Sequence, residues 1–150
     1  MVNFINSNPS CDLDGLTVFQ DAFDINLPNE YAEFLKQYNG CEPDGWHSFT
    51  SKDGKITSNL ESFFGLTCVN SYDRLTKRFI ESEDRIPREL LAIGHDSGGG
   101  LVCIAVKGKD RGKVFFWDRE FEEEAPTWNN TRLLANSFNE FLRSLTPDAI

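Results

Sequence analysis

Ser97 is a candidate nucleophile because it lies in Asp96-Ser97-Gly98-Gly99, a pattern found around the reactive serine of chymotrypsin-type proteases. That mechanism also needs a histidine base and an aspartate that orients the histidine. His47 is the candidate base, but it lacks the flanking residues expected around one, and a chain of 150 residues is short for a double-barrel protease. Because consecutive glycines permit positive φ angles, residues 96–100 are instead predicted to form a hairpin turn.

The two histidines, His47 and His95, are also the candidate metal ligands. His95 beside Asp96 has the composition of a general base or a metal ligand. Neither histidine has a second His or Cys at zinc-ligand spacing, and lone loop histidines are the simpler interpretation. The segment 108–113 has three residues between its glycines and Val114 after its lysine, whereas a phosphate-binding loop needs four residues and then Ser or Thr. Because no catalytic constellation is complete, we expect a protein that is not an enzyme and needs no metal and no cofactor.

An acidic run follows the last predicted core strand. It consists of Asp118, Glu120, Glu122, Glu123 and Glu124. Paired carboxylates serve glycoside hydrolysis when their separation suits the mechanism, and the sequence does not supply that distance. A solvated loop and a docking surface for a basic protein are the two other interpretations of the run.

Each of the three tryptophans stands near acidic residues. Trp46 follows Asp44, Trp117 precedes Asp118, and Trp128 follows the acidic run. Aromatic side chains beside charged ones are typical of the hot spots of protein interfaces, although Trp117 ends an apolar strand and suits the core equally well. The residues predicted to bind a partner are Asp44, Trp46, Asp118, Glu120 and Glu122.

The overall charge favours a basic partner. The chain has 15 basic and 24 acidic residues, which gives a net charge of −9. Residues 1–75 hold 11 acids and 4 bases, a difference of −7, whereas residues 76–150 hold 13 acids and 11 bases, a difference of −2. A negative field repels phosphate backbones, so we expect no nucleic-acid partner. The same field attracts a basic protein, although acidic surfaces also serve solubility alone.

We expect no export signal at the N-terminus. Residues 1–6 contain neither a basic region nor an apolar region, and no apolar run approaches the roughly 20 residues that a membrane span needs. Without export, the four cysteines are expected to be reduced thiols, and none of them are spaced as Cys-x-x-Cys. We therefore expect a cytoplasmic protein that has no membrane partner.

Helical periodicity is clearest over residues 28–39. The apolar residues at i, i+3, i+4 and i+7 are Tyr31, Phe34, Leu35 and Tyr38. Pro28 suits the first helical position, and Gly40 suits a left-handed stop after the helix. Weaker periodicity predicts helices over residues 16–23 and 71–80. Ser137 and Glu140 form a capping box that starts a closing helix.

Three apolar runs joined by glycine-rich loops predict an antiparallel meander, over residues 90–93, 101–106 and 114–117. Because these runs are nearly continuous in apolar residues, helices are expected to cover at least part of both sheet faces. Shorter strands are expected around residues 46–49 and 63–66, and residues 1–14 are expected to form a loosely ordered arm. The chain 1–150 is thus predicted to be a single α+β domain, with helices packed on a twisted, mainly antiparallel sheet.

Three groups of motifs follow one another along the chain. The first is Leu27-Pro28-x-x-Tyr31-x-x-Phe34-Leu35, with Tyr38-Asn39-Gly40 after it. The second is Ile93-Gly94-x-Asp96-Ser97-Gly98-Gly99, followed by Gly112-x-Val114-x-Phe116-Trp117-Asp118-x-Glu120. The third is Leu134-Ala135-x-Ser137-Phe138-x-x-Phe141-Leu142. In this order and spacing, over about residues 16–145, the chain resembles the SUKH superfamily.

The resemblance implies an α+β fold, no cofactor and a protein partner. The family includes many bacterial immunity proteins, which neutralise toxins used between competing cells, often nucleases or deaminases, and yeast cell-wall regulators of the Smi/Knr type. The expected function is that of an immunity protein that binds a cognate polymorphic or contact-dependent toxin domain. An intracellular regulatory scaffold module is the alternative. The chain departs from the family pattern at Cys41, Gly100 and Arg119, which leaves the identity of the partner open.

Overall fold

The computed structural model describes residues 2–6, 8, 13–67 and 74–147, and its centre is a seven-stranded sheet of order β1-β2-β5-β6-β7-β8-β9. The strands of this sheet are β1 (Phe4–Asn6), β2 (Cys41–Pro43), β5 (Ser62–Phe63), β6 (Leu90–His95), β7 (Leu101–Ala105), β8 (Val114–Trp117) and β9 (Thr131–Ala135). A smaller sheet has the order β10-β3-β4 and consists of β3 (His47–Thr50), β4 (Thr57–Asn59) and β10 (Thr146–Pro147). Every pair of neighbouring strands in the two sheets is antiparallel.

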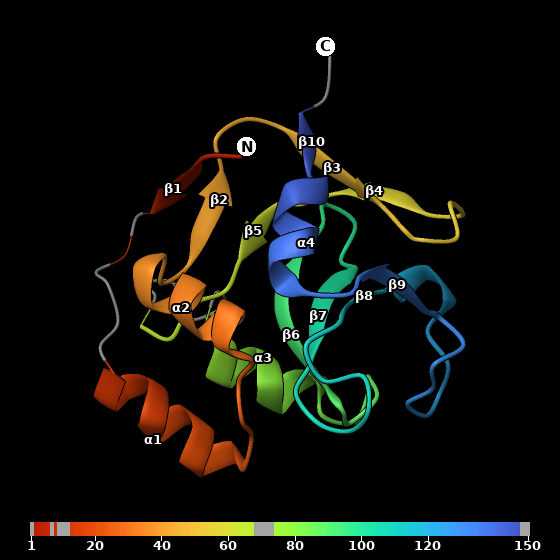
Figure 1. Ribbon diagram of the computed structural model, residues 1–150. Coiled ribbons are helices and arrows are strands. Elements are labelled where there is room, and N and C mark those ends of the chain that lie inside the picture. The colour runs from red at the N-terminus through yellow and green to blue at the C-terminus, as the bar shows by residue number, and fades with distance from the viewer. Residues whose placement is uncertain (1, 7, 9–12, 68–73, 148–150) are drawn as a thin grey trace.

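Helices cover both faces of the large sheet. The described α-helices are α1 (Leu13–Phe23), α2 (Asn29–Gln37), α3 (Leu75–Ser82) and α4 (Phe138–Ser144). On one face, rings of α2 and α4 pack on Phe63 of β5. On the other face, Arg78 of α3 lies 4.9 Å from the centre of the Phe64 ring. Figure 1 shows α4 crossing in front of β6 and β7, and α1 beside α2 and α3 at the lower left.

The predicted meander is present and its interior is fully packed. Strands β6, β7 and β8 pair in chain order, and Leu91, Ile104 and Trp117 are completely buried. Strands buried on both faces carry nearly continuous apolar runs, which explains the sequence pattern. The chain is an α+β protein, as the sequence predicts.

The turn between β6 and β7 is closed by its own aspartate. The Asp96 carboxylate accepts hydrogen bonds from the backbone N–H of Gly98 at 3.0 Å and of Gly100 at 2.7 Å. Gly99 has a φ of 88°, which explains why a glycine stands there. The predicted hairpin turn is therefore confirmed.

Helix α2 matches its prediction with one difference at its start. Tyr31, Phe34 and Leu35 are buried, and Gly40 has a φ of 80° after the helix. Pro28 is the N-cap, with φ −56° and ψ 140°. It therefore lies one position before the first helical residue, Asn29, whereas the sequence analysis placed Pro28 at the first helical position. The extended ψ of Pro28 turns the chain into the helix from the buried Leu27.

The closing helix α4 begins at the predicted cap. Ser137 Oγ accepts a hydrogen bond from the Glu140 N–H at 3.1 Å. The Glu140 carboxylate reaches back to the Asn136 N–H, one residue before the N–H that a standard capping box uses. Lys52 donates a hydrogen bond to Glu140, and this bond lowers the pKa of the Glu140 carboxyl.

Part of the segment expected to be a loose arm is a strand. Residues 4–6 form β1, which pairs with β2 at the edge of the sheet. The Phe4 ring lies 5.1 Å from Phe34 and 5.8 Å from Phe63, so burial of one aromatic side chain anchors the segment. For residues 4–6 the expectation of a loose arm is therefore wrong.

Other boundaries shift by a few residues. Helix α3 runs to Ser82, two residues beyond its predicted end, and the predicted residues 71–73 lie outside the described part of the chain. Phe49 lies in β3, but Trp46 precedes that strand. The strand expected over residues 63–66 is the two-residue β5.

Candidate functional site

The predicted partner-binding residues emerge at one edge of the large sheet. Strand register aligns the exit of β2, the start of β5, the end of β6 and the end of β8. The chain therefore leaves β2 toward Asp44 and leaves β8 toward Asp118 at the same edge of the sheet, where these two strands end. We call this edge the acidic edge, and define it by Asp44, Trp46, Glu61, Asp118, Glu120 and Glu122. In Figure 1 it runs from the arc that joins β2 to β3, across the top, toward the loop after β8.

The acidic edge has two separate groups of predicted residues. Asp44 and Trp46 follow β2, whereas Asp118, Glu120 and Glu122 follow β8, with β5, β6 and β7 between the two strands. Four steps of about 4.8 Å separate the groups by roughly 19 Å. The structure thus places both groups on one edge without bringing them into contact.

An open hollow of about 510 Å³ lies between the two groups. Glu61, Asp96 and Ser97 line it from the side of β5 and the β6–β7 turn, and Arg119 lines it from the side of β8. Glu61 accepts a hydrogen bond from Ser97 Oγ at 3.0 Å. The hollow adjoins the group after β8 through Arg119 and carries the carboxylates of Glu61 and Asp96, whereas Asp44 and Trp46 are not part of its lining.

Asp118 shapes the loop that carries Glu120. Its Oδ1 accepts the Glu120 N–H at 3.1 Å and caps the short 3-10 helix η2 (Arg119–Phe121). Its backbone N–H donates to the Asn130 carbonyl at 2.9 Å, and Asn130 Nδ2 donates to its carbonyl at 3.0 Å. Among the described residues, the Glu120 carboxylate has no hydrogen bond or ion pair, and it is therefore available to a partner.

Glu122 is engaged within the chain. Arg85 donates from Nε and from Nη2 to the two carboxylate oxygens of Glu122, both at 2.9 Å. The Arg85 guanidinium also lies 5.1 Å from the centre of the buried Trp117 ring. The hydrogen bonds from Arg85 lower the pKa of Glu122. Glu122 therefore fastens the loop after β8 to the segment after α3.

We expect Glu122→Gln to lower the free energy of unfolding by about 1 kcal/mol at neutral pH, because it removes the ion pair with Arg85. The loss is small because this ion pair is partly exposed to water. The pKa of Glu122 is lower in the folded state than in the unfolded state. The stabilisation is therefore present above the unfolded pKa and is lost as pH falls through the folded pKa. Urea denaturation of both proteins over a series of pH values measures this. Glu124→Gln, at an exposed carboxylate of the same loop, is the control, and a pH-independent difference for Glu122→Gln would contradict the assignment.

Phe121 is a candidate contact residue that the sequence analysis missed. Its side chain is 62% exposed and stands between Glu120 and Glu122. Trp46 is 49% exposed in the other group of the acidic edge. Trp117 is completely buried, which confirms its core interpretation, and Trp128 packs its ring against Phe115 at 5.2 Å. An aromatic residue inside a run of acids was the available signal for Phe121.

The candidate catalytic serine does not contact a histidine. The described partner of Ser97 Oγ is the Glu61 carboxylate. His95 Nε2 instead lies 2.9 Å from Ser62 Oγ, and its Nδ1 lies 2.9 Å from the Asp96 carbonyl. Ser62 and His95 are cross-strand neighbours of β5 and β6, and a backbone carbonyl takes the place where a triad has a carboxylate. Of this pair, His95 lines the hollow of the acidic edge, whereas Ser62 lines none of the four hollows considered among the described residues.

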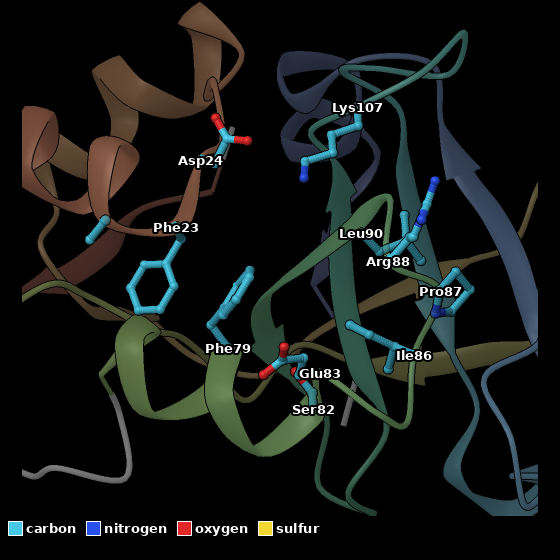
Figure 2. Close-up of a pocket in the computed structure, with 11 residues that line it drawn as sticks. Phe23, Asp24, Phe79, Ser82, Glu83, Ile86, Pro87, Arg88, Leu90 and Lys107 are labelled. Carbon is cyan, nitrogen blue, oxygen red and sulfur yellow. The ribbon is translucent and has the colours of Figure 1, made fainter.

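A second hollow, of about 390 Å³, opens on the opposite edge of the sheet. Figure 2 shows the Phe23 and Phe79 rings side by side at its wall, with Lys107 extending toward it. The ring centres are 4.5 Å apart. The one serine of its lining, Ser82, donates its hydroxyl to the Arg78 carbonyl at 2.6 Å. This hollow therefore offers an apolar wall with charged groups around it, and no activated nucleophile.

The described residues contain no cluster of three or more His, Cys, Asp or Glu side chains arranged to hold a metal ion. Cys41 and Cys103 are buried, and burial raises the pKa of the Cys103 thiol. A buried thiol of raised pKa is a poor nucleophile and a poor ligand. Within the part of the chain that the structure covers, no helix has the length and apolar character for crossing a membrane.

Comparison with known proteins identifies relatives over nearly the whole fold. Residues 10–144 match the sequence model of the SMI1 / KNR4 family (SUKH-1). The SPbeta prophage-derived uncharacterized protein YokK of Bacillus subtilis (strain 168) is 34% identical over 140 residues, which cover 83% of this chain and 69% of that protein. The SUKH family includes immunity proteins and is known for protein binding and not for catalysis. The matched residues run from before α1 to the end of α4, and the chain belongs to the SMI1 / KNR4 family (SUKH-1).

Proposed function

We propose that this protein is a cytoplasmic immunity protein, which binds a cognate bacterial toxin domain, a nuclease or a deaminase, and blocks its active site. Membership of a family of protein-binding immunity proteins carries the proposal. The acidic edge supports it, because an enzyme that acts on nucleic acid presents a basic surface to its substrate, and a negative surface is complementary to that. The net charge of −9 has the sign that this partner requires.

The carboxylates and the aromatic side chains at the acidic edge have different tasks in this proposal. Exposed carboxylates attract the basic domain over a distance and raise the association rate. Trp46 and Phe121, each exposed beside carboxylates, lose their contact with water on binding and slow dissociation. Because the two groups stand on either side of a hollow, a toxin domain seated across the edge would contact both.

The experiment measures binding of candidate nuclease and deaminase toxin domains, taken from the genes next to the gene of this protein. The double variant Asp118→Asn/Glu120→Gln removes two charges and keeps an oxygen that caps η2. We expect the association rate to fall at least threefold at low salt, and the difference from the parent to shrink at high salt. Trp46→Ala should leave the association rate nearly unchanged and raise the dissociation rate at least tenfold.

The matched control is Asp14→Asn/Asp21→Asn, which removes the same charge from exposed positions of α1, on the far side of the molecule in Figure 1. Co-expression of each variant with the toxin reports protection of cells. If the double variant at the acidic edge is folded, associates at the rate of the α1 control and protects as well as the parent, the acidic edge is not the binding surface. If the parent protein does not bind the toxin domain, the proposed function is wrong.

A further inference from the structure

An arginine-lined pocket lies beside the acidic edge, in a chain whose net charge is negative. The pocket has a volume of about 220 Å³ and opens between α3, the β6–β7 turn and η2. Three guanidinium groups line it, from Arg78, Arg85 and Arg119. The one carboxylate in its lining, Glu81, has its Oε1 3.0 Å from Lys77 Nζ. The pocket is therefore a local positive centre, and we call it the arginine pocket.

Arg119 has no hydrogen bond or ion pair to satisfy its side chain among the described residues. Its guanidinium lies directly against Gly99, where a Cβ would come within 2.8 Å of Nη1. Gly99 thus leaves the room that the arginine occupies at the mouth of the pocket. Five N–H donors in a fixed plane remain to be used by a bound group.

Arg85 is held in place with donors to spare. Its Nε and Nη2 bind Glu122, and the face of its guanidinium lies over Trp117. The Nη1 donors have no acceptor among the described residues. Because two contacts already fix the side chain, little conformational entropy is lost when these donors bind a ligand.

We infer that the arginine pocket receives a carboxylate side chain of the partner protein. Arginine presents its donors in a fork that matches the two oxygens of a carboxylate. Pockets for whole small molecules have volumes of about 300 Å³ or more, and this pocket is smaller. The inference rests on the proposed function and adds a specific anchor to it.

A carboxylate fits the surroundings better than a phosphate group does. The pocket shares Gly99 and Arg119 with the hollow of the acidic edge, whose lining includes Glu61 and Asp96. A phosphate monoester carries about two negative charges near neutral pH and is repelled more strongly by these carboxylates than a singly charged carboxylate is. A partner that is basic overall and presents one carboxylate to the arginine pocket would place positive charge against the hollow of the acidic edge and negative charge against the arginine pocket. This double complementarity would fix the orientation of the partner.

The first experiment tests the pocket alone, by NMR titration of the full chain with sodium acetate against sodium chloride at constant ionic strength. Saturable shifts are expected at the Gly99 amide and at the Arg85 and Arg119 side chains. Arg119→Gln should weaken acetate binding at least fivefold. Lys109→Gln removes the same charge from the exposed β7–β8 loop, at the opposite edge of the sheet, and should leave acetate binding unchanged.

The second experiment measures affinity for the toxin domain with the same two variants. We expect Arg119→Gln to weaken toxin binding at least tenfold through faster dissociation, and Lys109→Gln to have no effect. Absence of both acetate and inorganic phosphate binding, or equal acetate binding by the parent and the Arg119→Gln variant, overturns the pocket as an anion site. If the pocket binds inorganic phosphate but does not bind acetate, the assignment of a carboxylate ligand is wrong. A toxin bound by the parent and equally by Arg119→Gln overturns the anchor while the proposed function stands, whereas a parent that binds no toxin overturns the proposed function.

Discussion

Phe34→Ala is expected to lower the free energy of unfolding by roughly 3–5 kcal/mol, the usual loss when a buried aromatic site is emptied. The Phe34 ring of α2 lies 5.1 Å from Phe4 of β1, 5.1 Å from Phe63 of β5 and 5.0 Å from Phe138 of α4. Four elements that are far apart in the sequence meet at this side chain. No single neighbour can fill the space, because each ring is held by its own element.

Chemical denaturation of the parent and the variant measures this loss. Phe121→Ala is the matched control, since it is the same substitution at a side chain that is 62% exposed. The control should change the free energy of unfolding by less than about 0.5 kcal/mol. A loss below about 1 kcal/mol for Phe34→Ala would show that this ring is not part of the core.

Gly65→Ala is expected to destabilise the protein by about 3 kcal/mol, at the upper end of the usual cost of overpacking. A Cβ at position 65 would lie 2.5 Å from the Asn39 carbonyl carbon and 2.5 Å from the Gly40 nitrogen, both of which are backbone atoms. These atoms cannot rotate away as a side chain does. Asn39 is itself completely buried, and its Oδ1 accepts the Leu66 N–H at 2.6 Å, so the two segments cannot separate without breaking this contact.

Gly98→Ala is the control for Gly65→Ala. A Cβ at position 98 would find its nearest atom 3.8 Å away, and Gly98 does not have a positive φ. The free energy of unfolding of this variant should lie within about 0.5 kcal/mol of that of the parent. Equal midpoints and slopes for the two variants in denaturant would rule out the close approach of residue 65 to residues 39 and 40.

Binding measurements must be separated from these stability effects. Phe34 and Gly65 lie in the interior, and loss of toxin protection in their variants would report unfolding. The two binding variants of the acidic edge, Trp46→Ala and Asp118→Asn/Glu120→Gln, change exposed or half-buried groups and should keep the parent's denaturation midpoint. Denaturation curves for all variants therefore come before any interpretation of protection assays.

Local chemistry in the sequence was sufficient for three elements. The apolar stripe of α2 needs only neighbours three and four residues away, and the cap of α4 needs only Ser137 and Glu140. The β6–β7 turn is likewise made within five residues, by the Asp96 carboxylate and two backbone N–H groups. The motifs along residues 27–142 also identified the family, which the match over residues 10–144 confirms.

Only the tertiary structure decided which distant segments meet. The pairing of β1 with β2 depends on where the Phe4 ring finds a buried site, and residues 1–14 carry no local signal for it. Strand β9 pairs with β8 across the acidic loop, and its sequence Thr-Arg-Leu-Leu-Ala has no strict alternation to reveal it. The bidentate pair of Arg85 with Glu122 joins residues 37 positions apart. Composition and spacing determine helices, turns and net charge because these arise between near neighbours, whereas the acidic edge and the arginine pocket arise from strand order, which long-range packing selects.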